Sequence, residues 1–414
     1  MLIFSWKGEI YLDLVLGMKD THPQEVLKKR EIEFKLRHLF SSWGFEEVET
    51  PTLEYYATLQ KVIGDELKER LFQFINREGK LVCLRPDFTT SIARKYSSDL
   101  IIENKTIRVF YDGKIFRYPS SPLRTESELT QMGLENIGDN SPAVDAEVIA
   151  LAIIALQEAG IRDFSVDIGH VGFFRGILNA SGYSSTLQQQ LKTIVKTKDF
   201  IALKNFLEKN PPTEPMLVSL LLDFPFLRGK KEFLNDINNR FPRNHQFNNA
   251  LERIRKVCDI LSDYGLEQNI WVNLGLIRDF DYYSGMIFEG FSAFSGSPLL
   301  AGGRYDELFG IFGQDRPACG FALFIERLVE VFEKSRPDIN QAFKSYTIFY
   351  PPEHRKSVFI LTQKLRKLLQ AVIAQEQNDV PFALKLSDGF KEYTWTDLNW
   401  DTIYMQIQEV IKNG

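Results

Sequence analysis

The segment GLIRDFDYYSGMIFEGF, residues 275–291, places charged and phenolic side chains between apolar flanks typical of a buried strand. Its centre holds Arg278, Asp281, Tyr282 and Tyr283. Burying an unpaired charge is costly, so such a cluster must either satisfy its own hydrogen bonds or wait for a polar ligand. We favour a ligand site, and interpret Asp281 alone as structural support.

Three further segments carry polar side chains that fit a ligand site: residues 84–94, 116–138 and 301–328. In the first, Asp87 stands at the start of a predicted helix, where it is either an N-cap, a ligand group or both. Gln131 and Glu135 stand four residues apart on a predicted strand, so their side chains face the same side. For this pair we favour a site over a solvated face.

Motifs of the common nucleotide and nucleophile sites are missing from the sequence. The stretch AGGRYDELFG has three glycines but not the order of a dinucleotide or Walker loop, and by itself it predicts a turn between a strand and a helix. The five histidines are scattered without ligand spacing, so we expect neither a metal site nor a cofactor. The three cysteines lie far apart, which predicts reduced, buried thiols.

The composition is that of an ordinary globular protein. Of 414 residues, 44% are hydrophobic and 25% are charged, and the net charge of −5 argues weakly against a protein that coats phosphates. The N-terminus has Lys7, Glu9 and Asp13 within its apolar stretch, so it does not resemble a signal peptide, and the chain has no run of 18 apolar residues. We therefore expect a cytoplasmic protein that does not enter a membrane.

Periodicity and turn residues predict the main elements. They are a helix after residue 25 that Gly44 ends, a hairpin in residues 70–86, a strand pair around Asp112-Gly113, an apolar helix that Gly160 closes, a lysine-rich helical stretch that we interpret as solvated, a strand running into a helix in residues 316–335, and a helix around residues 355–376.

Strands in clusters with helices inserted between them predict an α+β protein with a mostly antiparallel sheet. The expected domains are a core in two parts (1–171 and 266–335), a helical insertion (172–265) and a small C-terminal domain (344–414).

In order and spacing, these segments resemble the catalytic core of class II histidyl-tRNA synthetases over roughly residues 15–335. The segment from Arg278 to Tyr283 resembles the histidine-specific motif of that family, residues 116–118 with 131–135 resemble motif 2, and residues 320–328 resemble motif 3. The resemblance implies the class II synthetase-like fold: an antiparallel sheet flanked by helices, with a helical insertion and a small C-terminal domain.

The resemblance also implies a pocket for free histidine. By position, Asp87, Thr89 and Gln131 would hold the α-amino group, Arg278 would face the carboxylate, Glu135 and Tyr283 would flank the imidazole, and Tyr282 and Tyr305 would form walls. These residue types match the chemistry of the ligand, because an ammonium needs acceptors, a carboxylate needs a cation and an imidazole needs a partner at each nitrogen.

The positions that bind ATP in synthetases are altered. Arg117 and Arg327 stand at the arginines of motifs 2 and 3, but Ser127 replaces the second motif 2 arginine, for which Arg124 is a possible substitute. Phe324 stands where the family keeps a glycine beneath the adenine. We interpret these four positions (Arg117, Ser127, Phe324 and Arg327) as a vestigial ATP site and favour a structural ion pair of Arg327 with Glu326 or another nearby carboxylate.

This combination resembles the regulatory subunits of short-form ATP phosphoribosyltransferase, paralogues of the synthetase that lack catalysis and act in the first step of histidine biosynthesis. That resemblance implies a self-dimer that assembles with the short catalytic subunit, supports its activity and binds L-histidine for feedback inhibition. The C-terminal stretch 344–414, with 9 Lys and Arg against 8 Asp and Glu, does not resemble an anticodon-binding domain, so we expect no tRNA partner. The alternatives are an active histidyl-tRNA synthetase with a degenerate motif 2 loop, and a sensor recruited for another process.

Overall fold

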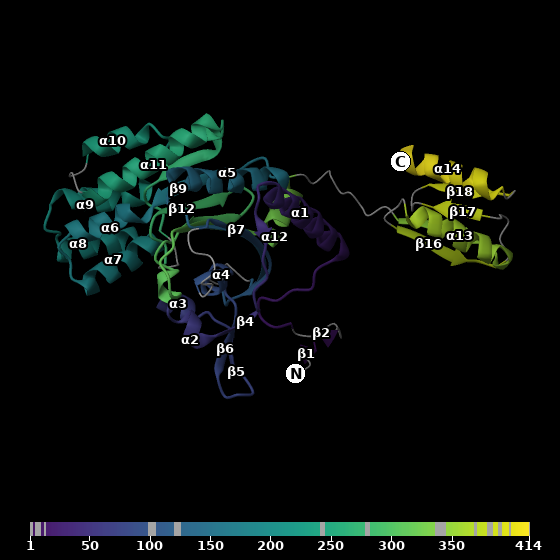
Figure 1. Cartoon of the computed structure of the whole chain (residues 1–414), viewed down its shortest axis with the longest axis horizontal. Helices are drawn as coiled ribbons and strands as arrows, with labels where there is room; N and C mark the ends of the chain where they lie inside the picture. The colour runs from purple at the N-terminus through teal and green to yellow at the C-terminus, as the bar shows by residue number, and fades with distance from the viewer. Residues whose placement is uncertain are drawn as a thin grey trace. The chain divides into compact units, whose positions relative to one another are not determined.

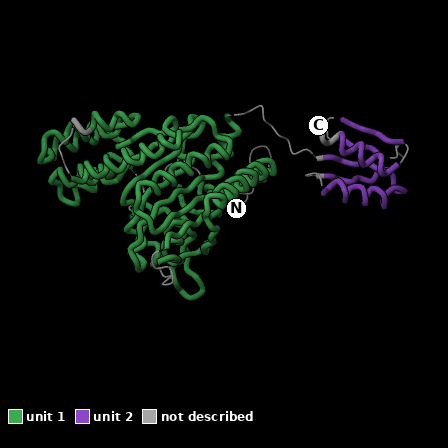
Figure 2. Tube along the Cα trace, turned by 45° about the horizontal axis from the view of Figure 1, so that its top comes forward, with its two compact units in different colours: residues 1–336 green, residues 337–414 purple. Residues whose placement is uncertain are grey.

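The computed structural model of the chain (Figure 1) describes residues 3–4, 10–11, 14–97, 105–119, 126–240, 245–277, 282–335, 345–367, 371–378, 384–387, 391–396 and 399–413. Two compact units are formed by residues 1–336 and 337–414, coloured green and purple in Figure 2. The first unit contains every segment that the sequence singles out as a site.

The first unit is built on a mixed sheet. In spatial order its strands are β10 (Arg228–Gly229), β11 (Ile270–Asn273), β9 (Ser165–His170), β12 (Met286–Phe291), β13 (Leu300–Arg304), β14 (Ala318–Phe324), β8 (Glu128–Ile137), β7 (Ile107–Phe116) and β3 (Glu46–Glu47). Within this sheet β11–β9 and β3–β7 are parallel pairs and the others are antiparallel. The predicted α+β class with a mostly antiparallel sheet is confirmed.

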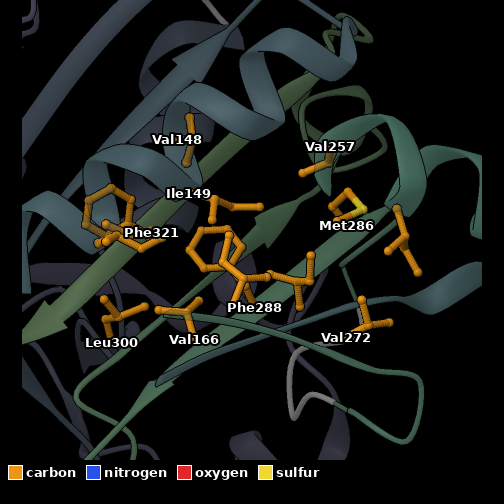
Figure 3. Packing of buried hydrophobic residues seen from close by; sticks show 14 of the residues in the cluster. Val148, Ile149, Val166, Val257, Val272, Met286, Phe288, Leu300 and Phe321 are labelled. Carbon is orange, nitrogen blue, oxygen red and sulfur yellow. The ribbon is translucent and has the colours of Figure 1, made fainter. Parts of the chain in front are cut away.

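Helices α1 (Pro23–Ser42), α5 (Pro142–Glu158) and α12 (Ile325–Ser335) cover one face of this sheet (Figure 1). The hydroxyl of Ser141 caps α5 by accepting a hydrogen bond from the Val144 N–H, and Gly160, with φ +83°, lies just beyond its end. Figure 3 shows Val148 and Ile149 of α5 packed over Phe288 and Phe321 of the sheet. This buried layer fixes which side of each strand faces the core.

The predicted strand pair around Asp112-Gly113 is wrong, because β7 runs through both residues as one strand. Gly113 lies opposite Gln131 of β8. A Cβ at Gly113 would lie 2.6 Å from the Arg85 guanidinium and 2.9 Å from the Phe88 ring. The glycine therefore permits a close approach of side chains and does not make a turn.

Between β9 and β11 the chain is mainly helical. Its elements are α6 (Val171–Ala180), α7 (Ser185–Thr197), α8 (Phe200–Lys209), α9 (Met216–Asp223), the short helix η1 (Phe224–Phe226), β10, α10 (Phe233–Arg240), α11 (His245–Asp263) and η2 (Glu267–Asn269). Helix α11 packs against α5, α6 and β9, so this helical insertion continues the core of the first unit.

On the opposite side of the sheet from α5, a smaller sheet and short helices complete the unit. They are β4 (Leu53–Tyr55), β6 (Leu81–Leu84), β5 (Gln73–Ile75), α2 (Tyr56–Leu59), α3 (Asp65–Lys68), α4 (Thr89–Ser97) and η3 (Gly310–Phe312), while β1 (Ile3–Phe4) and β2 (Ile10–Tyr11) form a separate pair. The antiparallel pairing of β5 with β6 confirms the predicted hairpin in residues 70–86.

The second unit has a sheet in the order β16 (Ala371–Glu376), β15 (Ser345–Tyr350), β17 (Leu384–Ser387) and β18 (Glu392–Trp395), with η4 (Pro352–His354), α13 (Arg355–Arg366) and α14 (Trp400–Asn413). The predicted helix over residues 355–376 is wrong beyond Arg366. Residues 371–376 pair in parallel with β15, so Val372 joins the core of this unit from a strand.

Across the described ranges, no helix is long and apolar enough to cross a membrane. The same ranges contain no cluster of His, Cys, Asp and Glu side chains suited to a metal ion.

Candidate functional site

A cleft lies on the sheet face opposite α5. Because neighbouring residues of a strand point to opposite faces, the residues that alternate with the core positions of β8, β13 and β14 line this cleft. Its volume is about 1770 Å³, and its lining includes Gln131, Ala301, Gly320 and Phe324. That is more space than one small ligand fills, since sites for drug-sized molecules measure roughly 300–1,000 Å³.

One corner of the cleft presents buried acceptors. Asp87 accepts a hydrogen bond from the Thr90 N–H at 2.9 Å through Oδ1, so it does cap α4. Its other oxygen, Oδ2, is buried and has no hydrogen-bond partner among the described residues, and Gln131 Oε1 is likewise unsatisfied within that part of the chain. Both side chains line the cleft, so this corner can accept hydrogen bonds from a cationic or N–H donor.

Burial raises the pKa of Asp87, although the hydrogen bonds from Thr90 and the charge of Arg117 act in the opposite direction. A ligand ammonium beside Oδ2 would add positive charge that favours the carboxylate form. The capping contact and the open oxygen together leave room for both roles predicted for Asp87.

Glu135 is buried beneath this corner and joins two side chains that line the cleft. Its Oε1 accepts a hydrogen bond from Thr89 Oγ1 at 2.8 Å, and its Oε2 accepts one from the Tyr305 hydroxyl. Burial raises the pKa of Glu135 to about 8 despite these two hydrogen bonds. A Cβ at Gly320 would lie only 1.6 Å from Glu135 Oε2, so the neighbouring strand must carry a glycine here.

Three tyrosine rings form a wall of the cleft. The ring centroids of Tyr282 and Tyr283 are 5.0 Å apart, and those of Tyr282 and Tyr305 are 5.8 Å apart. All three side chains are buried, and they lie with Asp87, Thr89 and Gln131 around one cavity. Arg278, Asp279 and Asp281 lie outside the described residues, so the predicted partner of a ligand carboxylate stays a prediction.

Next to this corner, the end of the cleft at β14 contains Phe324, which pairs with Gln131 of β8 and lies close to two arginines. The guanidinium carbon of Arg327 lies 4.2 Å from the centroid of the Phe324 ring, and that of Arg117 lies 5.8 Å from it. Arg327 Nη1 also donates to the Pro298 carbonyl at 2.7 Å, and Ser127 is buried, with its carbonyl accepting a hydrogen bond from the Arg117 N–H. A phenyl ring thus occupies this end beside both cations.

Of the two partners predicted for Arg327, Glu326 or another nearby carboxylate, the structure shows the second. Glu326 instead accepts hydrogen bonds from Lys29 Nζ and from the Thr130 N–H, each at 2.7 Å. The carboxylate beside Arg327 is Glu126, at 3.9 Å, which is the neighbouring carboxylate left open in that prediction.

Comparison with known proteins agrees with this geometry. A family model described as histidyl-tRNA synthetase matches residues 17–328. The ATP phosphoribosyltransferase regulatory subunit of Acetivibrio thermocellus is 34% identical over 85% of this chain and 84% of its own length. The protein of the same name from Desulfitobacterium hafniense is 36% identical over 81% of this chain and 86% of its own length. The chain belongs to the histidyl-tRNA synthetase family and to the family of ATP phosphoribosyltransferase regulatory subunits.

Solved structures of this family have the same fold. A Bacillus halodurans protein described as an ATP phosphoribosyltransferase regulatory subunit/histidyl-tRNA synthetase superposes with a TM-score of 0.77, at 30% identity, over 89% of this chain and 94% of its own. A histidyl-tRNA synthetase from Nostoc superposes with a TM-score of 0.76 over 97% of this chain and 100% of its own, at 18% identity. A match of that extent covers most of residues 337–414, so the C-terminal unit shares its fold with a synthetase although its sequence does not show it.

The structure places further residues at the cleft that were not among the predicted site residues. Lys192, Lys196 and Lys198 of the helical insertion line the cleft, so part of the predicted solvated face borders this site. Lys198 has φ +54° at the end of α7, a conformation that glycine adopts more readily. The i,i+4 spacing of Lys192 and Lys196 beside the buried Leu191 and Val195 was a usable signal for a shared face, but nothing in it indicated a cleft.

Proposed function

We propose that the chain is the non-catalytic regulatory subunit of ATP phosphoribosyltransferase, which acts in the cytoplasm in the first step of histidine biosynthesis and binds free L-histidine without activating it. The observation that carries this proposal is the contrast between two neighbouring parts of the cleft. The corner with Asp87 and Gln131 has acceptors without a partner among the described residues, while Phe324 lies beside Arg327 at the position where the resemblance places the nucleotide base.

Histidine fits the open corner by its charges. Its ammonium would donate to Asp87 Oδ2 and Gln131 Oε1, which have no other described donor. Its carboxylate would meet Arg278, as predicted from the sequence. Its imidazole would lie against Tyr283, near the Thr89–Glu135–Tyr305 hydrogen bonds, where a carboxyl with a pKa of about 8 can donate or accept near neutral pH.

The filled end argues against adenylation. A synthetase needs cations aimed at the α-phosphate and space for the adenine. Arg327 stacks on Phe324 and donates to the Pro298 carbonyl. The buried Ser127 stands at the position of the second motif 2 arginine. We therefore expect neither ATP–pyrophosphate exchange nor aminoacylation of tRNA.

Regulation of the catalytic subunit follows from linkage. If histidine binds one state of the assembly more tightly, it shifts the whole assembly toward that state and lowers activity at a distant site. In the absence of histidine, the same subunit would hold the catalytic subunit in its active state. The names of the relatives imply this partnership with a catalytic subunit.

A self-dimer is part of the proposal, because motif 1 lines the dimer interface in this fold. Exposed apolar side chains on α1 and on the small sheet support it: Val26, Phe34, Leu53, Tyr55 and Phe74. Phe34 is 74% exposed, which is unusual for a large apolar side chain with no partner to cover it.

The absence of a tRNA partner also stays part of the proposal. The C-terminal unit exposes Lys356 and Phe359 on α13 and Lys367 just beyond it, whereas Lys364 lies over the Tyr404 ring. Retention of tRNA by the chain in a filter-binding assay at physiological salt would therefore contradict this part without touching the histidine site.

The experiment for the whole proposal mixes the purified chain with the short catalytic subunit. The chain should raise the formation of the phosphoribosyl product, and L-histidine should then lower it. Histidine-dependent ATP–pyrophosphate exchange by the chain alone would contradict the proposal and identify the chain as an active synthetase.

A further inference from the structure

The loop that carries Tyr283 into the cleft is held from two sides. On one side, the Arg304 carbonyl accepts a hydrogen bond from the Ser284 N–H at 2.8 Å, and the Arg304 side chain packs so closely that a Cβ at Gly285 would lie 3.0 Å from its Cδ. On the other side, Arg175 Nη2 of α6 donates to the Tyr283 carbonyl at 3.0 Å. The Val171 N–H at the start of α6 also donates to the Gly285 carbonyl at 3.0 Å.

Arg304 is in turn bridged to the helical insertion through a buried carboxylate. Asp145 of α5 is completely buried, and its Oδ1 accepts a hydrogen bond from Arg304 Nε at 2.8 Å and forms an ion pair with Nη2 at 2.7 Å. Its Oδ2 accepts a hydrogen bond from Arg253 Nε at 2.7 Å and forms an ion pair with Nη2 at 2.6 Å. Arg253 belongs to α11, so one carboxylate holds an arginine of the sheet and an arginine of the insertion.

Both connections lead from the same pair of helices to the same tyrosine wall. Helices α6 and α11 pack against each other beside β9 (Figure 1). Through Arg175 they reach the backbone of Tyr283, and through Arg253, Asp145 and Arg304 they reach the end of β13, where the next residue is Tyr305.

We infer that Arg175 and the Arg253–Asp145–Arg304 bridge are positioning residues that couple the amino-acid pocket to the helical insertion, so that a ligand among the tyrosines fixes the position of α6 and α11. This inference rests on the proposed histidine pocket. It assigns the insertion the task of carrying the state of the pocket to the rest of the assembly.

Arg175 is the part of this connection that stability does not require. Its side chain is exposed, whereas Asp145 and Arg304 are buried charges whose loss would unfold the region. An exposed arginine that made no contact with a residue of the pocket would have no effect on ligand binding there. Arg175 instead donates to the carbonyl of a residue that lines it.

The test is hydrogen–deuterium exchange of the full chain with and without saturating L-histidine, together with calorimetric titration. In the wild type, histidine should slow exchange in α6 and α11 by about fivefold or more. In Arg175→Ala and in Arg253→Lys, histidine should still bind, but the slowing should fall to about twofold or less. Arg175→Lys, which keeps a cationic donor, should restore part of it.

Arg255→Ala is the matched control, because this arginine lies on α11 and contacts only Asn235 of α10, at 3.3 Å, among its hydrogen bonds to described residues. It should behave as the wild type. Histidine binding without slowed exchange in α6 and α11, or full slowing in Arg175→Ala, would overturn the inference while leaving the pocket intact. Failure of the wild type to bind histidine at all would overturn both.

Discussion

The guanidinium carbon of Arg327 lies 4.2 Å from the centroid of the Phe324 ring, so a cation that serves ATP in synthetases is here stacked on a phenyl group. We propose that the ring takes space from a nucleotide base and that its contact with Arg327 withdraws a cation from the phosphates. In the proposed account, this contact is what separates binding of an amino acid from its activation.

Replacing Phe324 should partly reopen that end of the cleft. Phe324→Ala should raise the affinity for ATP by about tenfold or more, because it frees both the space and the Arg327 guanidinium. It should also lower the free energy of unfolding by about 3–5 kcal/mol, since the ring is buried. Equilibrium dialysis with ATP measures the gain, and Phe291→Ala, elsewhere in the cleft, is the control. Equal ATP binding by wild type and variant would show that Phe324 does not block the nucleotide.

Asp87→Asn should weaken histidine binding without harming the fold. Asparagine can still cap α4 through its side-chain oxygen, but it presents no negative charge to the ligand ammonium. We expect a loss of about 2–3 kcal/mol, or roughly 30–150-fold in affinity, by calorimetric titration. As a control, Asp112→Asn should leave the affinity unchanged, because Asp112 lies on the face of β7 opposite the cleft and pairs with Arg37. An unchanged affinity in Asp87→Asn would remove Asp87 from the pocket.

Glu135 should make the stability of the chain depend on pH. Its pKa is raised to about 8 in the folded state from about 4.5, so the folded state holds a proton that the unfolded state has lost between these values. Its contribution to stability is therefore present below pH 4.5 and is lost as the pH rises through 8, by up to a few kcal/mol. Glu135→Gln should remove this part of the decline in urea unfolding measured at pH 5.5, 7 and 8.5. The same slope in variant and wild type would contradict the raised pKa.

Glu326 should matter for stability and not for the ligand. Glu326→Ala leaves Lys29 and the Thr130 N–H without their carboxylate, which should cost about 2–4 kcal/mol in the free energy of unfolding. Glu330→Ala on the same helix removes only an exposed pair with Lys334 and should cost less than about 1 kcal/mol. Chemical denaturation measures both, and a fall in histidine affinity for Glu326→Ala would contradict a purely structural role.

Local patterns in the sequence predicted the elements that carry the site. The period of two placed Gln131 and Glu135 on one face of β8, and both pair with cleft-side positions of β14, Phe324 and Gly320. The predicted strand running into a helix in residues 316–335 is confirmed by β14 and α12, and Phe324 is the last residue of β14. These predictions rest on short-range rules, and the structure follows them.

Features that depend on distant contacts were not predictable in this way. Gly113 resembles a turn residue, yet it makes room for Arg85 and Phe88 from another segment. Lys192 and Lys196 resemble a solvated helix face, yet they line a cleft that the sheet forms. The contact of Arg175 with the Tyr283 carbonyl joins residues 108 positions apart, and no pattern within the sequence predicts it.

Calorimetric titration of the purified chain with L-histidine and then with ATP tests the central claim most directly. We predict that histidine binds and that ATP gives no binding signal, because the acceptor corner is open and Phe324 fills the nucleotide end. Binding of ATP with release of pyrophosphate in the presence of histidine would contradict the claim and identify an active synthetase.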